Sequence, residues 1–154
     1  MRVILAVVGK PRDPALAAAI RDYETRAARY WPLDVYEVRE EPARANPVDV
    51  VREREGERLR GKVPGAARLV VCERDGTRYS SEHFATFVQQ AREDGRDLAF
   101  TIGGAYGLPA SLTERAAARL ELAPWTLPHE LARLVLAEQL YRAGTIVRGE
   151  PYHK

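Results

Sequence analysis

Apolar residues occur along this chain in five short runs that are separated by segments with helical periodicity. The runs span residues 3–8, 33–38, 68–72, 98–102 and 120–122. The third and fourth, RLVVC and LAFTI, show little polar alternation, which is typical of strands covered on both faces. Strands that alternate with helices predict an α/β fold with a mostly parallel sheet of five to six strands.

Helix starts are marked by capping residues. Asp13 and Asn46 each precede a proline suited to the first helical turn, and Ser80 or Ser81 is placed to cap a helix over residues 82–93. That third helix has one apolar face, which predicts packing on the sheet. Its apolar residues are Phe84, Phe87, Val88 and Ala91. A further helix is expected to start near Pro109.

The last predicted helix has almost no polar stripe. Its apolar residues are Leu131, Leu134, Val135, Leu136, Ala137, Leu140, Tyr141 and Ala143. A helix that is apolar nearly all round must be buried nearly all round, so we expect the sheet on one side and a second subunit on the other. The spacings of Glu138 with Arg142, and of Glu130 with Arg133, predict ion pairs within the helix.

Residues 39–65 form the most charged segment and contain the run REREGERLR. The pattern favours a solvated helix face with ion pairs. The alternative is a contact with an RNA backbone through Arg52, Arg54, Arg58 and Arg60, whose joint substitution should then flatten the salt dependence of binding.

Length and composition limit the classes of protein. With 154 residues, 45% of them hydrophobic, the chain is expected to form one domain over residues 1–154. No apolar stretch approaches the roughly 18 to 20 residues of a membrane span, and the first run is too short for a signal peptide, so we expect a cytoplasmic protein. One cysteine and three scattered histidines predict no disulfide and no metal site. A net charge of +2 permits a nucleic-acid partner without requiring one.

Two loops follow predicted strands and are candidates for ligand binding. The first, IGGAYGL, contains Gly103 and Gly104, which allow a sharp turn and close approach of a ligand to the main chain. Its spacing matches neither the dinucleotide fingerprint nor a P-loop. The second loop, LAPWTLPH, is stiffened by two prolines and offers main-chain groups that could read an adenine edge. A core position for the Trp125 side chain and a structural role for His129 at a helix N-terminus are the competing interpretations.

The C-terminal segment RGEPYHK is polar and aromatic. Composition alone predicts a disordered end, since termini fray, although an aromatic ring, an imidazole and two cations could also position a base.

Three motifs, IGGAYG, TLPHELARLVLAEQLYRA and RGEPYHK, together resemble the signatures of the RlmH family of 23S rRNA pseudouridine N3-methyltransferases, which belongs to the SPOUT superfamily. They occur in the order and spacing of that family up to the last residue, and the N-terminal half resembles it more loosely. The resemblance implies a C-terminal deep trefoil knot, a type of topology that is otherwise nearly absent from proteins. It also implies a homodimer.

The resemblance further implies a site for S-adenosylmethionine made by three loops. These correspond here to Cys72, where relatives commonly have leucine, to Gly103 and Gly104, and to a third group at residues 122–127. That group is Leu122, Ala123, Pro124, Trp125, Thr126 and Leu127. The implied substrate is a pseudouridine of 23S rRNA in the assembled ribosome, whose N3 attacks the methyl group of the cofactor.

The protein then mainly aligns the reactants and removes the N3 proton. A general base or a cation that stabilises the developing anion are the available catalytic roles. The candidates are His129, Glu138, Arg142, Tyr152 and His153.

Three alternatives to this function stay open. One is a SPOUT methyltransferase that acts on another rRNA base or on tRNA, and another is a non-catalytic RNA-binding module of the ribosome. A flavodoxin-like nucleotide-binding regulator would use the glycine loop for phosphate, but it leaves the TLPHE and PYHK motifs without a role.

Overall fold

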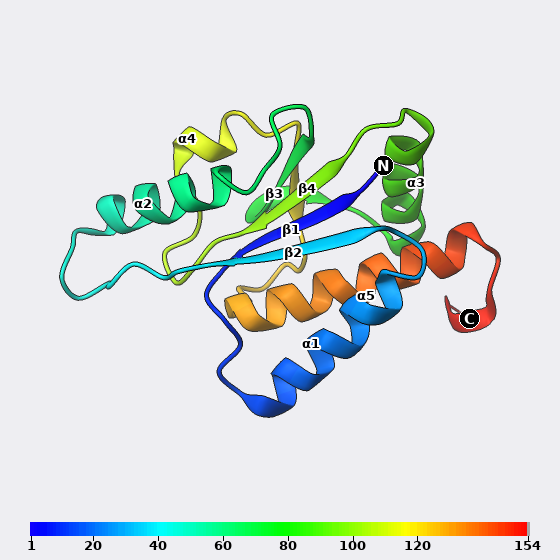
Figure 1. The fold of residues 1–154 in the computed structure, drawn as a ribbon, viewed down its shortest axis with the longest axis horizontal. Coiled ribbons are helices and arrows are strands. Elements are labelled where there is room, and N and C mark those ends of the chain that lie inside the picture. Colours follow the sequence, from blue (N-terminus) through cyan, green and yellow to red (C-terminus); the bar gives the residue numbers. More distant parts are fainter. Residues whose placement is uncertain (154) are drawn as a thin grey trace.

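The computed structural model describes residues 1–153, with the side chain of His153 left out. Strands and helices alternate along the chain (Figure 1). The strands are β1 (Val3–Val8), β2 (Leu33–Val38), β3 (Arg68–Arg78), β4 (Leu98–Ile102) and β5 (Ala118–Glu121). The helices are α1 (Pro14–Ala27), α2 (Val48–Arg60), α3 (Ser81–Glu93), α4 (Ala110–Thr113), α5 (His129–Val147) and the 3-10 turn η1 (Pro151–His153).

The five strands form one sheet in the order β2-β1-β4-β3-β5, and all neighbouring strands are parallel. This confirms the predicted α/β fold with a parallel sheet. The pairing of β3 with β5 is interrupted, because Leu120 lies opposite both Cys72 and Thr77. Residues 73–76 therefore leave the regular register, and β3 runs six residues beyond the predicted strand 68–72.

Both faces of the sheet are covered by helices. In β1, Val3, Leu5 and Val7 belong to the larger apolar cluster, with residues of α1, α3 and α5. Ala6 and Val8 point to the opposite face and pack with Leu59 of α2 and Leu112 of α4. This two-faced burial explains why the central strands have no polar alternation.

Two of the three predicted caps are present. The Asp13 carboxylate accepts hydrogen bonds from the amides of Ala15 (2.8 Å) and Leu16 (3.1 Å), and the Ser80 hydroxyl accepts one from His83. The Asn46 cap was wrong, since its side-chain amide instead donates to the Pro42 carbonyl and α2 begins after Pro47 without a side-chain cap. The helix expected near Pro109 is α4, a single turn.

Helix α5 packs on β4, and α1 and α3 flank it. Figure 1 shows α1 and α5 lying side by side below the strands. The Trp31 indole nitrogen, fully buried after α1, donates to the Leu140 carbonyl at 2.8 Å. Of the eight apolar residues on which the prediction of a buried helix rests, four are buried within the chain and four are only half-buried; the half-buried ones are Leu131, Leu134, Val135 and Tyr141. The second subunit expected on the other side of α5 stays a prediction.

One of the two predicted ion pairs within α5 is confirmed. Arg142 pairs with Glu138 at 2.7 Å. The Glu130–Arg133 pair was wrong, because the buried Arg133 guanidinium turns inward to Glu24 of α1 and Glu37 of β2, at 2.8 Å each. Glu130 accepts a hydrogen bond from the Arg12 amide instead.

The charged segment is held by ion pairs, as the sequence favoured. Arg52 pairs with Asp49, whereas Arg54 and Arg58 both reach Glu41 in the loop before α2. Three of the four arginines considered for RNA contact therefore already have a carboxylate partner. Within residues 1–153, no helix is long and apolar enough to cross a membrane.

Candidate ligand pocket

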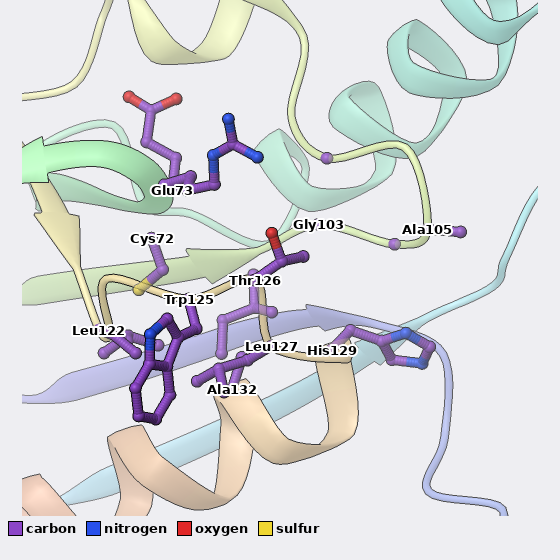
Figure 2. Close-up of a pocket in the computed structure, with 15 residues that line it drawn as sticks. Cys72, Glu73, Gly103, Ala105, Leu122, Trp125, Thr126, Leu127, His129 and Ala132 are labelled. Atoms are coloured by element: carbon purple, nitrogen blue, oxygen red, sulfur yellow. The ribbon is translucent and has the colours of Figure 1, made fainter.

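A cavity of about 210 Å³ opens where β4 and β5 end and where β3 leaves the regular register, beside the first turn of α5 (Figure 2). Its walls come from three loops that are far apart in sequence. Its lining residues are Cys72, Glu73, Arg74, Ile102, Gly103, Gly104, Ala105, Gly107, Leu122, Ala123, Trp125, Thr126, Leu127, His129 and Ala132. The carboxyl ends of parallel strands are where α/β proteins place their ligands.

The glycine loop turns back on itself in a way that requires glycine. Gly104 and Gly107 form an isolated bridge, and Gly107 has a φ of 76°. A Cβ atom on Gly103 would lie 2.7 Å from the carbonyl carbon and oxygen of Gly107. Beneath the loop, the Glu55 carboxylate would lie 2.8 Å from a Cβ on Gly104, so both glycines keep the main chain close to its neighbours.

Within β3, Cys72 gives the cavity an apolar wall, and the charged residues Glu73 and Arg74 follow it. The sulfur of Cys72 lies on the side of Leu122 and Trp125 (Figure 2). Burial, helped by the negative charge of Glu73, raises the pKa of the Cys72 thiol to about 12. The thiol therefore stays neutral and acts as a small apolar group rather than a nucleophile. Glu73 itself is ion-paired with Arg119 of β5.

The proline loop, residues 122–128, forms the third wall. Leu122 and Leu127 are half-buried, but the Trp125 side chain is 77% exposed. The core position considered for Trp125 was therefore wrong, since Trp31 from the end of α1 already occupies the core. Pro124 is exposed in this loop and does not line the cavity.

His129 is the first residue of α5 and lines the same cavity. Its Nε2 atom is buried without a hydrogen-bond partner in the described structure and lies 3.7 Å from Glu40 Oε1. His129 is thus the one candidate catalytic residue that touches the cavity of its own chain within the described structure.

Three other candidates meet at a second place, along α5 and η1. The Tyr152 hydroxyl donates to Glu138 Oε1 at 3.0 Å, and the Arg142 guanidinium donates to the same oxygen and lies 4.9 Å from the centre of the Tyr152 ring. Burial and hydrogen bonds to Tyr23 and Glu138 raise the pKa of Tyr152. We call Glu138, Arg142 and Tyr152 the tail cluster.

The tail cluster is separated from the cavity of its own chain. Ala132 is the cavity residue furthest along α5, and Glu138 follows it by six positions, which at a rise of 1.5 Å per residue is about 9 Å along the axis. The tail is ordered as far as Tyr152, because Tyr152 contacts Glu138 and Tyr141; composition alone predicts disorder there. The predicted role of His153 concerns a side chain that lies outside the described residues, as does Lys154.

Several residues of the cavity were missed by sequence reasoning. Glu73 and Arg74 directly follow a predicted strand end, a signal that could have identified them. Ala132 and the supporting residue Glu55 carry no such signal, because only the tertiary fold brings them to this place. In the part of the chain that the structure describes, no three His, Cys, Asp or Glu side chains gather to hold a metal ion.

Comparisons with known proteins give a consistent result. The family model described as "Predicted SPOUT methyltransferase" matches residues 1–153. The chain is 62% identical over 154 residues to ribosomal RNA large subunit methyltransferase H of Gemmatimonas aurantiaca, covering 100% of both chains. It is 42% identical to the protein of the same name from Geotalea daltonii, with 99% of both chains covered.

Solved structures support the fold. A probable methyltransferase from Bordetella pertussis matches with a TM-score of 0.55 and 15% identity, over 92% of this chain and 95% of that one. A probable methylase family protein from Haemophilus influenzae matches with a TM-score of 0.57 and 13% identity, over 99% of this chain and 70% of that one. At such low identity these two structures support the fold alone.

Proposed function

Because this chain belongs to the SPOUT methyltransferase family, we propose that it transfers a methyl group from S-adenosylmethionine to ribosomal RNA of the large subunit. The observation that carries the proposal is the three-loop cavity, in a chain that is 62% identical over its full length to a large-subunit rRNA methyltransferase. We place the reaction at N3 of a pseudouridine in 23S rRNA of assembled ribosomes, in the cytoplasm, as the sequence motifs imply.

The walls of the cavity fit such a cofactor. Leu122, Leu127 and Ile102 offer apolar surface for an adenine ring, and the neutral Cys72 continues that surface. Gly103 and Gly104 leave main-chain groups open to hydrogen bonding. S-adenosylmethionine would supply a methyl group bound to a positively charged sulfonium. The sulfur would leave as a neutral thioether, so the protein need not activate the donor.

Two further features belong to this proposal. We expect the C-terminal segment to form the trefoil knot typical of the superfamily, which would hold the proline loop around the cofactor. We also expect a homodimer in which the tail of one subunit reaches the cavity of the other. Within one chain, Glu138 of the tail cluster lies about 9 Å along α5 from Ala132 of the cavity, and this separation supports the arrangement.

The tail cluster restricts the roles of its members. Since the pKa of Tyr152 is raised, its hydroxyl stays protonated at neutral pH and can donate a hydrogen bond but cannot accept the N3 proton. Arg142 keeps its positive charge beside Glu138 and suits the stabilisation of a developing anion. The general base is therefore to be sought among His153, His129 and Glu138.

The proposal is tested with ribosomes from cells that lack this protein. Mass mapping of methylated pseudouridine, before and after the purified protein and S-adenosylmethionine are added, should show one methyl group restored in 23S rRNA. An unchanged map would refute the proposed function.

Variants of the tail separate catalysis from cofactor binding. We expect His153→Ala and Tyr152→Phe to lower turnover of ribosomes much more than affinity for S-adenosylmethionine, since both residues would act on the substrate. Calorimetry measures the affinity, and an equal loss of both quantities would contradict this assignment.

A further inference from the structure

Four large hydrophobic side chains are markedly exposed in the described structure; Trp125 lines the cavity, and Tyr106 lies between two residues that line it, Ala105 and Gly107. The four are Tyr36, Val48, Tyr106 and Trp125, with exposed fractions of 38%, 40%, 40% and 77%. Single exposed apolar residues are ordinary on protein surfaces. Two aromatic residues on two different loops of one ligand cavity are a more specific arrangement, because aromatic faces at a pocket are binding surfaces for bases.

Trp125 is held in this exposed position by its loop. Pro124 and Pro128 restrict the backbone on both sides, and Leu122, Ala123, Trp125, Thr126 and Leu127 of this loop line the cavity. The indole projects from the loop on the side of α5, away from Ala105 (Figure 2). Residue 125 therefore contributes to the cavity wall and still leaves most of its ring available to a second ligand.

Tyr106 occupies the tip of the glycine loop. The Gly107 amide donates to the Gly104 carbonyl at 3.1 Å, which closes a tight turn and leaves Ala105 and Tyr106 outside it. The Tyr106 side chain is 40% exposed and is not packed into the core.

Arg74 is the cationic member of this rim. It is exposed, lines the cavity, and has no carboxylate partner among the described residues. The neighbouring Glu73 does not neutralise it, because Glu73 is ion-paired with Arg119. An unpaired guanidinium and an exposed indole at the same cavity match the chemistry of an RNA strand, which presents phosphates and base faces alternately.

We propose that Trp125, Tyr106 and Arg74 form an RNA-binding rim that receives the unpaired nucleotides next to the methylated one. The aromatic rings stack on bases, and Arg74 contacts a phosphate. This inference rests on the proposed function, since it assigns the substrate side of the same site. The rim would position the strand over the cavity without taking part in proton transfer.

Trp125→Ala is the decisive variant. Stacking of one base on an aromatic ring corresponds to a loss of about 5- to 150-fold on substitution by alanine, so we expect the KM for unmethylated ribosomes to rise within that range. The affinity for S-adenosylmethionine should change far less, since the main chain of residue 125 is kept, and Trp125→Phe should recover part of the loss. Arg74→Gln should lower the salt slope of RNA binding by about one.

Tyr36→Ala is the matched control. Tyr36 is an exposed aromatic of β2, at the opposite edge of the sheet from β5, and its ring lies 5.6 Å from the Lys62 ammonium. Its loss should leave the KM for ribosomes unchanged. A Trp125→Ala variant with unchanged KM, or with an equal loss of S-adenosylmethionine affinity, would overturn the rim.

Fluorescence gives an independent measurement, because the other tryptophan, Trp31, is fully buried. An oligoadenylate of about ten nucleotides, within the length that single-strand-binding folds cover, should quench wild-type emission but not that of Trp125→Ala. If Trp125 instead becomes shielded from acrylamide as protein concentration rises without RNA, it belongs to a subunit interface and the rim is refuted. Should the wild type methylate no rRNA, the proposed function fails, and this titration still decides the rim.

Discussion

Replacing Arg133 by methionine should destabilise the protein strongly. The guanidinium donates to Glu24 at 2.8 and 3.2 Å and to Glu37 at 2.8 Å, and only 7% of the side chain is exposed. Methionine fills a similar volume but leaves Glu24 and Glu37, whose side chains are 12% and 28% exposed, without a cation. Removal of one partner from a buried ion pair costs about 3–5 kcal/mol, which is a large part of the stability of an ordinary domain.

Urea unfolding of the two proteins measures this cost as a shift of the midpoint at constant slope. Arg26→Met is the matched control, because its pair with Asp22 on α1 is exposed and contributes little to stability. Adding Glu24→Gln and Glu37→Gln to Arg133→Met should restore most of the stability, since no buried charge then remains. A loss below about 1 kcal/mol in the single variant would refute the role of a buried, charge-compensated arginine.

Three further changes test the close contacts of the fold. Gly103→Ala places a Cβ against the Gly107 carbonyl. Calorimetry should show that the affinity for S-adenosylmethionine falls by about tenfold or more, which corresponds to about 1.4 kcal/mol. An unchanged affinity would contradict this. Gly144→Ala, which helix propensity alone predicts to stabilise, should destabilise by about 1–3 kcal/mol in urea, because the Cβ would lie 2.2 Å from Tyr30 Cγ. Burial raises the pKa of Glu55, so the free energy of unfolding should fall as pH rises above the usual carboxyl value of 4.5. Glu55→Gln should remove that decline, be more stable than wild type at pH 8 and resemble it at pH 4, and a parallel pH dependence of both proteins would count against it.

Local sequence determined the elements of this fold. The bounds of β1, β2 and β4 agree with the predicted runs; β1 and β4 are buried throughout, whereas β2, LDVYEV, mixes apolar with charged residues and is only partly buried. Asp13 and Ser80 cap helices through bonds that span only two or three residues. The two loops at the cavity were also visible, since glycines and prolines mark them within a few positions.

Tertiary structure decided the features that depend on distant partners. The extension of β3 requires pairing with β5, more than 40 residues later, and therefore has no local signal. Arg133 had an acidic neighbour in the right helical position, but burial against α1 and β2 offered two carboxylates and better geometry. In the same way, composition left the tail without structure, whereas contacts of Tyr152 with Glu138 and Tyr141 order it.

The sequence by itself thus determined the strands, most helix starts and the loops from which the pocket is made, because these follow from apolar periodicity and short-range hydrogen bonds. The fold decided how the three loops enclose one cavity, how far α5 is buried within its own chain and why Trp125 faces outward. These outcomes depend on which surfaces compete for the same interior space. Trp31 fills the core beside α5, and Trp125 is left at the rim of the cavity.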